Sequence, residues 1–304
     1  MDFVTFAEMV KDEVGKTVGS NFQIRLNDVR KNNGIILKGI TVVENDNNIA
    51  PTIYLNNYYK DYVDGKTTFV KIIDDLMGIY HKNKINQSVD MRHFLNYEKV
   101  KQRIVYKLIN TEKNKELLND IPHIDFLDLS IVFQYLVTQE NLGMAAILIH
   151  NVHQKLWGVS VEDLYQAAKE NTHTLLKYEI KSMSKVLCEI REEEGLEESE
   201  DDYMMEISDS VPMYVLTNKQ RVEGAACMLY SDLLHHFSDK IGKNLFIIPS
   251  SIHELLLLPA DHDVEALEVK RMIKEINDTQ VSTEEILSYS LYFYDRQVGK
   301  IVMR

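Results

Sequence analysis

Residues 244–260 read N-L-F-I-I-P-S-S-I-H-E-L-L-L-L-P-A and decide how the C-terminal half of the chain folds. The two apolar runs in this stretch, 245–248 and 255–258, are too short for helices. The break at 249–251 contains a proline, which has no backbone donor, and two serines whose hydroxyls can bond turn amides. The stretch therefore predicts a buried hairpin. Residues 253–254 are expected just inside its returning strand.

The hydrophobic periodicity of the whole chain predicts an α+β protein. Residues 1–92 are expected to form an N-terminal unit of helix, three-stranded meander and helix, with helices at 3–14 and 69–82 and strands at 22–26, 34–43 and 49–55. Residues 93–304 are expected to form a larger mixed α/β unit. Its predicted helices are 94–102, 161–170, 183–194, 220–241 and 264–277, and its predicted strands are 103–110, 127–137, 144–150, 213–217 and a terminal hairpin at 289–302. The spacing at 103–110 also fits a helix.

Most of the net charge of −13 is confined to one acidic stretch, since residues 192–202 contain eight acidic side chains and no basic one. The segment 195–209 lacks apolar periodicity, so it is expected to form an exposed acidic loop that interrupts the second unit. The remaining surface is nearly balanced in charge. This pattern disfavours a nucleic-acid-binding protein, which usually carries a basic stripe.

The cysteine content and the hydropathy bound the location of the protein. Cys188 and Cys227 are far apart and show neither a zinc spacing nor a disulfide framework. No window approaches the roughly 20 apolar residues of a membrane-spanning helix. The N-terminal residues lack a basic region followed by an apolar one. We therefore expect a cytoplasmic protein with no membrane partner.

Three fragments resemble catalytic motifs and fail on spacing. The tripeptides at 15–17 and 65–67 read Gly-Lys-Thr, but the leading glycine of a phosphate-binding loop is replaced by Val10 and Lys60. The pair 253–254 reads His-Glu like the start of a zinc-protease motif, yet Leu257 occupies the position of the second histidine. Helix caps and an ordinary strand start explain these fragments.

Polar side chains that follow apolar segments are the candidates for a binding site, because ligand pockets form where buried strands end. The candidate residues are His150, Asn151, His153, Trp157, Asn171, Asn218, Ser250, Ser251, His253 and Glu254. The close histidine pair lacks an adjacent third ligand, so no metal site is predicted. No cofactor is predicted either.

Several segments together resemble an uncharacterised bacterial family that is catalogued only as a domain of unknown function. These segments are P-T-I-Y-L at 51–55, R-I-V-Y-K-L-I-N at 103–110, I-L-I-H-N at 147–151, N-T at 171–172, M-Y-V-L-T-N at 213–218, P-S-S-I-H-E at 249–254 and Y-D-R at 294–296. The resemblance covers almost the whole chain. The part from Arg103 onward is also similar to a second bacterial family of unknown function, through a W-G-V-x-x-x-x-L helix start at 157–164 and a late apolar hairpin. Neither resemblance implies an activity.

Two functions are consistent with these patterns. A non-catalytic binding or accessory protein is favoured, because no set of residues has the spacing for nucleophilic, metal or phosphate chemistry. Its partner could be another protein or a small ligand. The alternative is a hydrolase whose site is assembled by folding from His150, His153, Ser250, His253 and Glu254.

Overall fold

The chain divides into two compact units, Met1–Phe94 and a second unit that comprises Leu95–Gln139 and Gly143–Arg304. The predicted acidic loop at 195–209 lies outside the described residues. Within those residues, no helix is both long enough and apolar enough to cross a membrane. The computed structural model describes residues 1–44, 50–83, 91–138, 144–194, 212–260 and 265–304.

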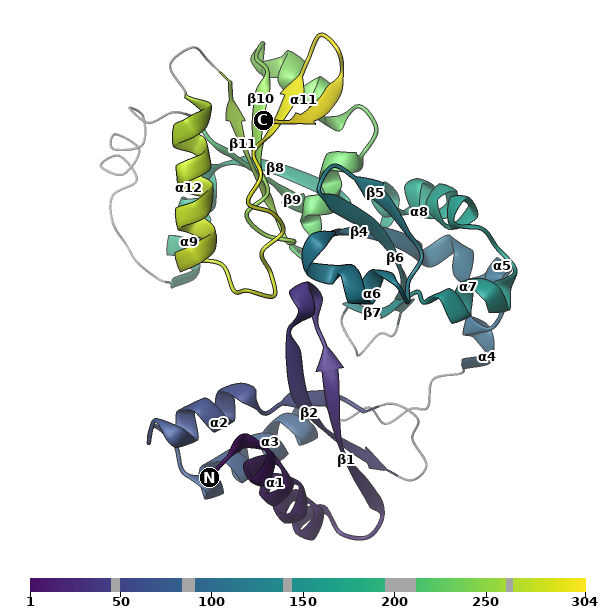
Figure 1. The fold of residues 1–304 in the computed structure, drawn as a ribbon, viewed down its shortest axis with the longest axis vertical. Coiled ribbons are helices and arrows are strands. Elements are labelled where there is room, and N and C mark those ends of the chain that lie inside the picture. Colours follow the sequence, from purple (N-terminus) through teal and green to yellow (C-terminus); the bar gives the residue numbers. More distant parts are fainter. Residues whose placement is uncertain (45–49, 84–90, 139–143, 195–211, 261–264) are drawn as a thin grey trace. The chain divides into compact units, whose positions relative to one another are not determined.

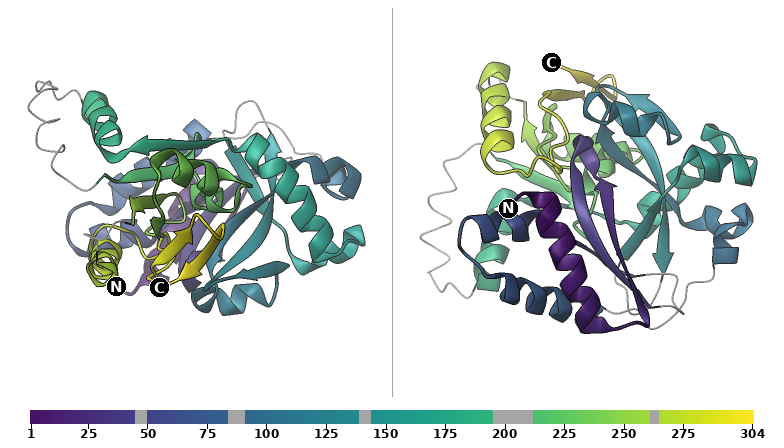
Figure 2. Two further views of the ribbon diagram at one scale, coloured as in Figure 1. Left: turned by 90° about the horizontal axis from the view of Figure 1, so that it is seen from above. Right: turned by 60° about the horizontal axis from the view of Figure 1, so that its bottom comes forward.

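The first unit packs helices on one face of an antiparallel sheet (Figures 1 and 2), and the predicted order of helix, meander and helix is confirmed. The sheet order is β1-β2-β3. Alternate residues of β1 point into the core, as expected for a sheet with one buried face. The structure also contains a helix at Asn56–Val63, after the meander, which the sequence did not predict. The elements are α1 (Phe3–Val18), β1 (Phe22–Arg30), η1 (Asn32–Gly34), β2 (Ile36–Glu44), β3 (Thr52–Tyr54), α2 (Asn56–Val63), α3 (Phe69–Asn83) and α4 (Met91–Phe94).

Local signals in the first unit act as the sequence indicates. The Asp2 side chain accepts the Thr5 N–H at 2.8 Å and so caps α1. The turn between β1 and β2 places Asn33 and Gly34 at positive φ, which these two residue types tolerate best. The hairpin register follows from that turn, with Arg30 opposite Ile36.

The second unit begins with a four-stranded sheet in which β6 pairs with β4, β5 and β7, all antiparallel. The predicted strands at 103–110, 127–137 and 144–150 are confirmed, and the predicted helix at 94–102 is replaced by two short pieces. The elements are α5 (Tyr97–Val100), η2 (Lys101–Arg103), β4 (Ile104–Asn110), η3 (Glu112–Asn114), α6 (Lys115–Leu118), β5 (His123–Phe126), β6 (Leu129–Thr138), β7 (Met144–Leu148), α7 (Asn151–Trp157) and α8 (Val161–Leu175).

A six-stranded antiparallel sheet completes the second unit, in the order β13-β12-β10-β11-β9-β8. Its two central strands are the predicted buried hairpin, which is confirmed with Phe246 opposite Leu258. His253 and Glu254 precede the returning strand and do not lie inside it. The elements are β8 (Tyr178–Ser182), α9 (Met183–Glu194), β9 (Tyr214–Asn218), η4 (Gly224–Leu229), α11 (Leu233–Ile241), β10 (Leu245–Ile248), β11 (Leu255–Pro259), α12 (Ala266–Thr279), β12 (Tyr292–Asp295) and β13 (Lys300–Met303).

Both faces of the central hairpin are buried, which explains its unbroken apolar runs. On one face, Phe246 and Ile248 share a core with Val269 and Ile273 of α12, and Val186 of α9 packs against the same core. On the other face, α11 packs against β9. The ring of Phe237 in α11 lies 5.0 Å from the ring of Tyr214 in β9, measured between centroids.

The helix predicted at 220–241 is wrong, although its apolar periodicity is real. Arg221, Glu223 and Asp232 adopt left-handed backbone conformations, with φ of 53°, 53° and 59°. A continuous right-handed helix cannot pass through them. The segment instead forms η4 and the shorter helix α11, and its apolar side chains pack as two separate pieces.

Candidate functional site

The predicted candidates His150, Asn151, His153 and Trp157 gather at α7. The His150 N–H donates to His153 Nδ1 at 3.0 Å, and the Asn151 side-chain amide donates to the carbonyl of Asn119 at 2.9 Å. The His153 and Trp157 rings lie 6.0 Å apart. Burial, with a smaller contribution from neighbouring His150, lowers the pKa of His153. These contacts fix the start of the helix.

The predicted candidate His253 is held through both ring nitrogens. Its Nδ1 accepts the Glu223 N–H at 3.1 Å, and its Nε2 lies 3.6 Å from Oε1 of Glu285. Its own backbone N–H donates to Ser251 Oγ at 3.0 Å. A neutral imidazole with Nδ1 as acceptor carries its proton on Nε2, so the ring has no unoccupied lone pair for a substrate proton.

The two predicted asparagines bond the backbone. The Asn171 amide donates to the carbonyls of Lys101 and Ile104 at 2.7 and 3.0 Å, which ties the middle of α8 to the start of β4. The Asn218 amide donates to the Val222 carbonyl at 2.7 Å and closes the turn after β9. Both side chains therefore hold local backbone in place, and this structural role accounts for them without a ligand.

A part-buried polar junction, absent from the sequence predictions, links the four-stranded sheet to the residue that precedes η4. One Glu223 carboxylate oxygen accepts from Lys107 Nζ at 2.6 Å, and the other accepts from the Gln134 side-chain amide. The Lys107 and Glu223 side chains are 23% and 16% exposed. Lys107 and Gln134 belong to β4 and β6, whereas Glu223 immediately precedes η4. This polar junction accounts for the strained backbone at Glu223, which the surrounding contacts hold in place.

A cleft of about 540 Å³, here called the tyrosine cleft, opens between α8 and α11. Two of its tyrosines, Tyr106 and Tyr230, are buried, and Tyr178 is 50% exposed. The remaining lining side chains are mostly polar. The lining residues are Tyr106, Gln166, Lys169, Glu170, His173, Tyr178, Leu229, Tyr230, Ser231, Leu233 and His236.

The buried groups of the tyrosine cleft are kept uncharged by their surroundings. Burial raises the pKa of both Tyr106 and Tyr230. Burial also raises the pKa of the neighbouring Cys227 thiol to about 12. The Tyr230 hydroxyl donates to the Leu176 carbonyl at 2.6 Å. A thiol with such a pKa is not a nucleophile at neutral pH, so this cleft presents neutral phenols and no reactive thiolate.

A second cleft of about 640 Å³, here called the hairpin cleft, shares Leu229 and Tyr230 with the first. Its other lining residues come mainly from α11 and from the β12–β13 hairpin. The lining residues are Phe126, Met228, Leu229, Tyr230, Asp232, Leu234, His235, Tyr294, Arg296, Gln297, Val298, Gly299, Lys300 and Ile301.

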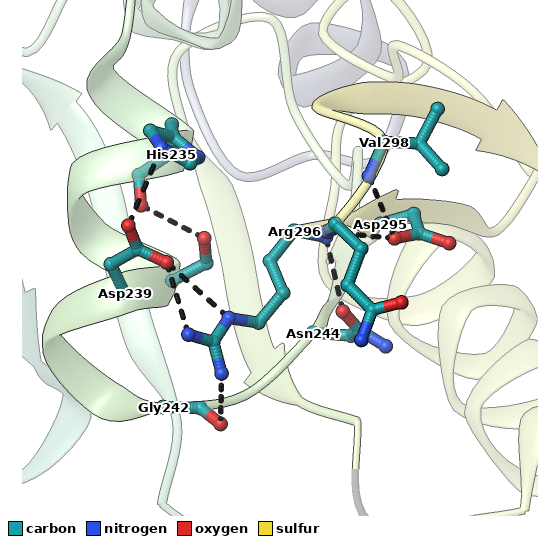
Figure 3. Close-up of polar contacts among 9 residues, drawn as sticks. His235, Asp239, Gly242, Asn244, Asp295, Arg296 and Val298 are labelled. Atoms are coloured by element: carbon teal, nitrogen blue, oxygen red, sulfur yellow. Dashed lines mark hydrogen bonds and ion pairs between the residues drawn. The ribbon is translucent and has the colours of Figure 1, made fainter.

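The guanidinium of Arg296 bonds protein groups at the edge of the hairpin cleft. Figure 3 shows its guanidinium reaching α11, where Nε and Nη2 lie 3.3 and 3.2 Å from Asp239 Oδ1 and Nη1 donates to the Gly242 carbonyl at 2.9 Å. Its backbone N–H donates to Asn244 Oδ1 at 3.0 Å. His235 Nε2 lies 3.3 Å from the other Asp239 oxygen. These exposed pairs fix the turn and contribute little free energy.

None of the ten sequence-predicted candidates lines either of these two clefts. Ser250 is buried beside the central hairpin, and Glu254 is exposed. The tyrosines that do line a cleft gave no signal in the sequence, because an alternating Tyr106 in a strand reads as an ordinary core residue.

Across the described ranges, no three His, Cys, Asp or Glu side chains lie close enough together to hold a metal ion. The absence of a metal, expected from the sequence, stays a prediction.

Comparison with known protein families identifies one that matches nearly the whole chain. Residues 3–296 match a family of unknown function, DUF5688. The chain belongs to DUF5688. The near full-length resemblance to an uncharacterised family is thereby confirmed. No curated protein and no solved structure matches the chain. DUF5688 membership brings no activity with it.

Proposed function

We propose that this DUF5688 protein is a non-catalytic binding protein that takes a small molecule in the tyrosine cleft. The observation that carries the proposal is the cleft itself, about 540 Å³ in volume, with tyrosines from β4, β8 and the η4–α11 segment around it. Ligand pockets combine aromatic walls with a few polar groups in this way. Tyr178, which is 50% exposed, offers a ring face to the ligand.

The bonding of the other candidates supports binding over the hydrolase alternative. A serine nucleophile needs a base within hydrogen-bonding reach. His253 has both nitrogens directed at Glu223 and Glu285, and Ser251 Oγ accepts the His253 backbone N–H. A hydrolase that used His253 as its base would have to break these contacts.

We propose a cytoplasmic location, because Cys188 and Cys227 are both free thiols and reducing compartments favour that state. We also propose that residues 1–92 and 93–304 act as separate domains.

Thermal unfolding with small probes tests the proposed function. The probes are nucleosides, aromatic amino acids and aromatic amides. A ligand at about 100 times its Kd stabilises the native state by about 2.7 kcal/mol, which raises Tm by roughly 5–10 °C in a unit of this size. We expect at least one probe class to raise Tm in the wild type and not in Tyr178→Ala.

Tyr289→Ala is the matched control, because Tyr289 is 45% exposed and lines neither cleft. It should respond to the probes as the wild type does. A Tm that no probe raises, or a rise that persists in Tyr178→Ala, would contradict the proposed function. Turnover of p-nitrophenyl acetate that disappears in His253→Ala would support the hydrolase instead.

A further inference from the structure

Tyr106 is a buried residue whose hydroxyl has no hydrogen-bond partner among the described residues. Tyr106 is 2% exposed, and its backbone N–H donates to Thr172 Oγ1 at 3.1 Å. No described side chain or backbone group accepts from its hydroxyl. Two other buried tyrosines do have partners, since the hydroxyl of Tyr230 bonds Leu176 and that of Tyr292 bonds Asp128. Asn277 Oδ1 is the single fully buried side-chain polar atom without a partner among the described residues, so the Tyr106 hydroxyl is still reached by solvent. A donor that lines a cleft and has no protein partner is available to a ligand or to water.

The place of Tyr106 favours a ligand. Tyr106 lines the tyrosine cleft, and its ring is packed between Tyr165 and Tyr230, with centroid distances of 6.4 and 6.5 Å. Packed neighbours hold a side chain in one rotamer, so the hydroxyl is pre-positioned. A pre-positioned donor costs little entropy when a ligand binds.

We infer that the tyrosine cleft binds a neutral ring-containing molecule whose carbonyl-type oxygen accepts the Tyr106 hydroxyl. This inference rests on the proposed function and names the chemical class of its ligand. Tyr178 at the exposed side of the cleft stacks on the ring, and Tyr106 bonds the oxygen.

The surroundings of Tyr106 discriminate against an anionic acceptor. Burial raises the pKa of Tyr106 and Tyr230 and raises that of Cys227 to about 12, so this region penalises negative charge. A carboxylate or a phosphate placed there would meet the same desolvation cost. The exposed side chains Lys169 and Glu170 add opposite charges to the lining and favour neither sign. An uncharged carbonyl oxygen is therefore the acceptor that fits.

Benzamide and benzoate are matched probes, because both carry a ring and an oxygen acceptor and differ in charge. The full chain is labelled with ¹³C at the tyrosine ζ carbons, and each probe is titrated while the NMR signals are recorded. The Tyr106→Phe variant removes only the hydroxyl and identifies the Tyr106 signal by its absence. Tyr165→Phe is the control, since Tyr165 contacts the Tyr106 ring but does not line the cleft.

We expect benzamide to shift the Tyr106 and Tyr178 signals of the wild type and of Tyr165→Phe. In Tyr106→Phe, the benzamide Kd followed at the Tyr178 signal should rise about tenfold, the effect of one lost hydrogen bond. Benzoate should bind more weakly than benzamide. Tyr106→Phe should fold normally, because its missing hydroxyl leaves no protein group unpaired.

The inference would be overturned by benzoate binding as tightly as benzamide, or by a benzamide Kd that Tyr106→Phe leaves unchanged. If Tyr178→Ala still abolished binding in those cases, the proposed function would stand and only the ligand class would be wrong. Probes that leave both signals unmoved would also overturn the inference. Thermal unfolding with the nucleosides, aromatic amino acids and aromatic amides then decides separately whether the cleft binds any small molecule.

Discussion

Gly224→Ala is expected to destabilise the second unit by about 3 kcal/mol, the upper end of the range for overpacked interiors. A Cβ added at Gly224 would lie 2.2 Å from Thr217 Oγ1, 2.4 Å from the His253 carbonyl oxygen and 2.8 Å from the Asn218 nitrogen. Two of these atoms are backbone, so they cannot move aside at low cost. The measurement is urea unfolding followed by the fluorescence of Trp157, the single tryptophan, which lies in the second unit.

Gly78→Ala is the control for this experiment. No atom lies within 4 Å of a Cβ added at Gly78, which is in α3 of the first unit. Alanine inside a helix is favoured over glycine by roughly 0.5–1 kcal/mol. The Trp157 transition should therefore not move to lower urea. A Gly224→Ala variant that unfolds at the wild-type urea midpoint would show that η4 does not pack as closely against β9 as the structure has it.

Glu223→Ala is expected to have the next largest effect, a loss of about 2–4 kcal/mol. Removing one member of a buried ion pair leaves the other charge uncompensated, which costs about 3–5 kcal/mol when burial is complete. The Lys107 and Glu223 side chains are 23% and 16% exposed, so the expected loss of stability is somewhat smaller than for a fully buried pair. Gln134 also loses the partner of its side-chain amide. The same Trp157 transition measures the loss.

Two comparisons test the Glu223 prediction. Glu112→Ala removes an ion pair with Lys115 whose side chains are 76% and 65% exposed, so it should cost less than about 1 kcal/mol. The double variant Lys107→Ala, Glu223→Ala should be less destabilised than the sum of the two single variants. Additive losses, or a Glu223→Ala cost no larger than that of Glu112→Ala, would contradict a part-buried junction between β4 and Glu223.

The central hairpin was predictable because its signals are local. Four apolar residues on each side of a proline and two serines leave few alternatives to a buried reversal. Its two edges pair with β12 and β9, whereas its faces are buried because α12 packs on one side of the sheet and α11 on the other. The capping box of α8 was equally readable, and Ser160 Oγ accepts the Asp163 N–H at 3.1 Å.

The segment around η4 was not predictable for a physical reason. Its apolar residues recur at helical spacing, but Glu223 turns out of the helical path to meet Lys107, which lies 116 residues earlier in the chain. Long-range polar contacts leave no trace in local periodicity. A tertiary contact here overrides the local preference, as it often does.

The tyrosine cleft escaped prediction for the same reason. Tyr106, Tyr178 and Tyr230 come from three separate elements, and the fold alone brings them to one cleft. The sequence instead drew attention to histidines and serines after apolar runs. In the structure, His153 and His253 order the local backbone, because the Nδ1 atom of each ring accepts a backbone N–H.

The most direct test of a binding role for the tyrosine cleft is a crystal structure of this DUF5688 protein soaked with a library of small neutral and charged fragments. We predict that ring-containing amides and ketones occupy the tyrosine cleft more often than other surfaces, with an oxygen within about 3 Å of the Tyr106 hydroxyl, the length of a hydrogen bond. Fragments that leave this cleft empty and gather beside His253 and Ser251 would contradict the account.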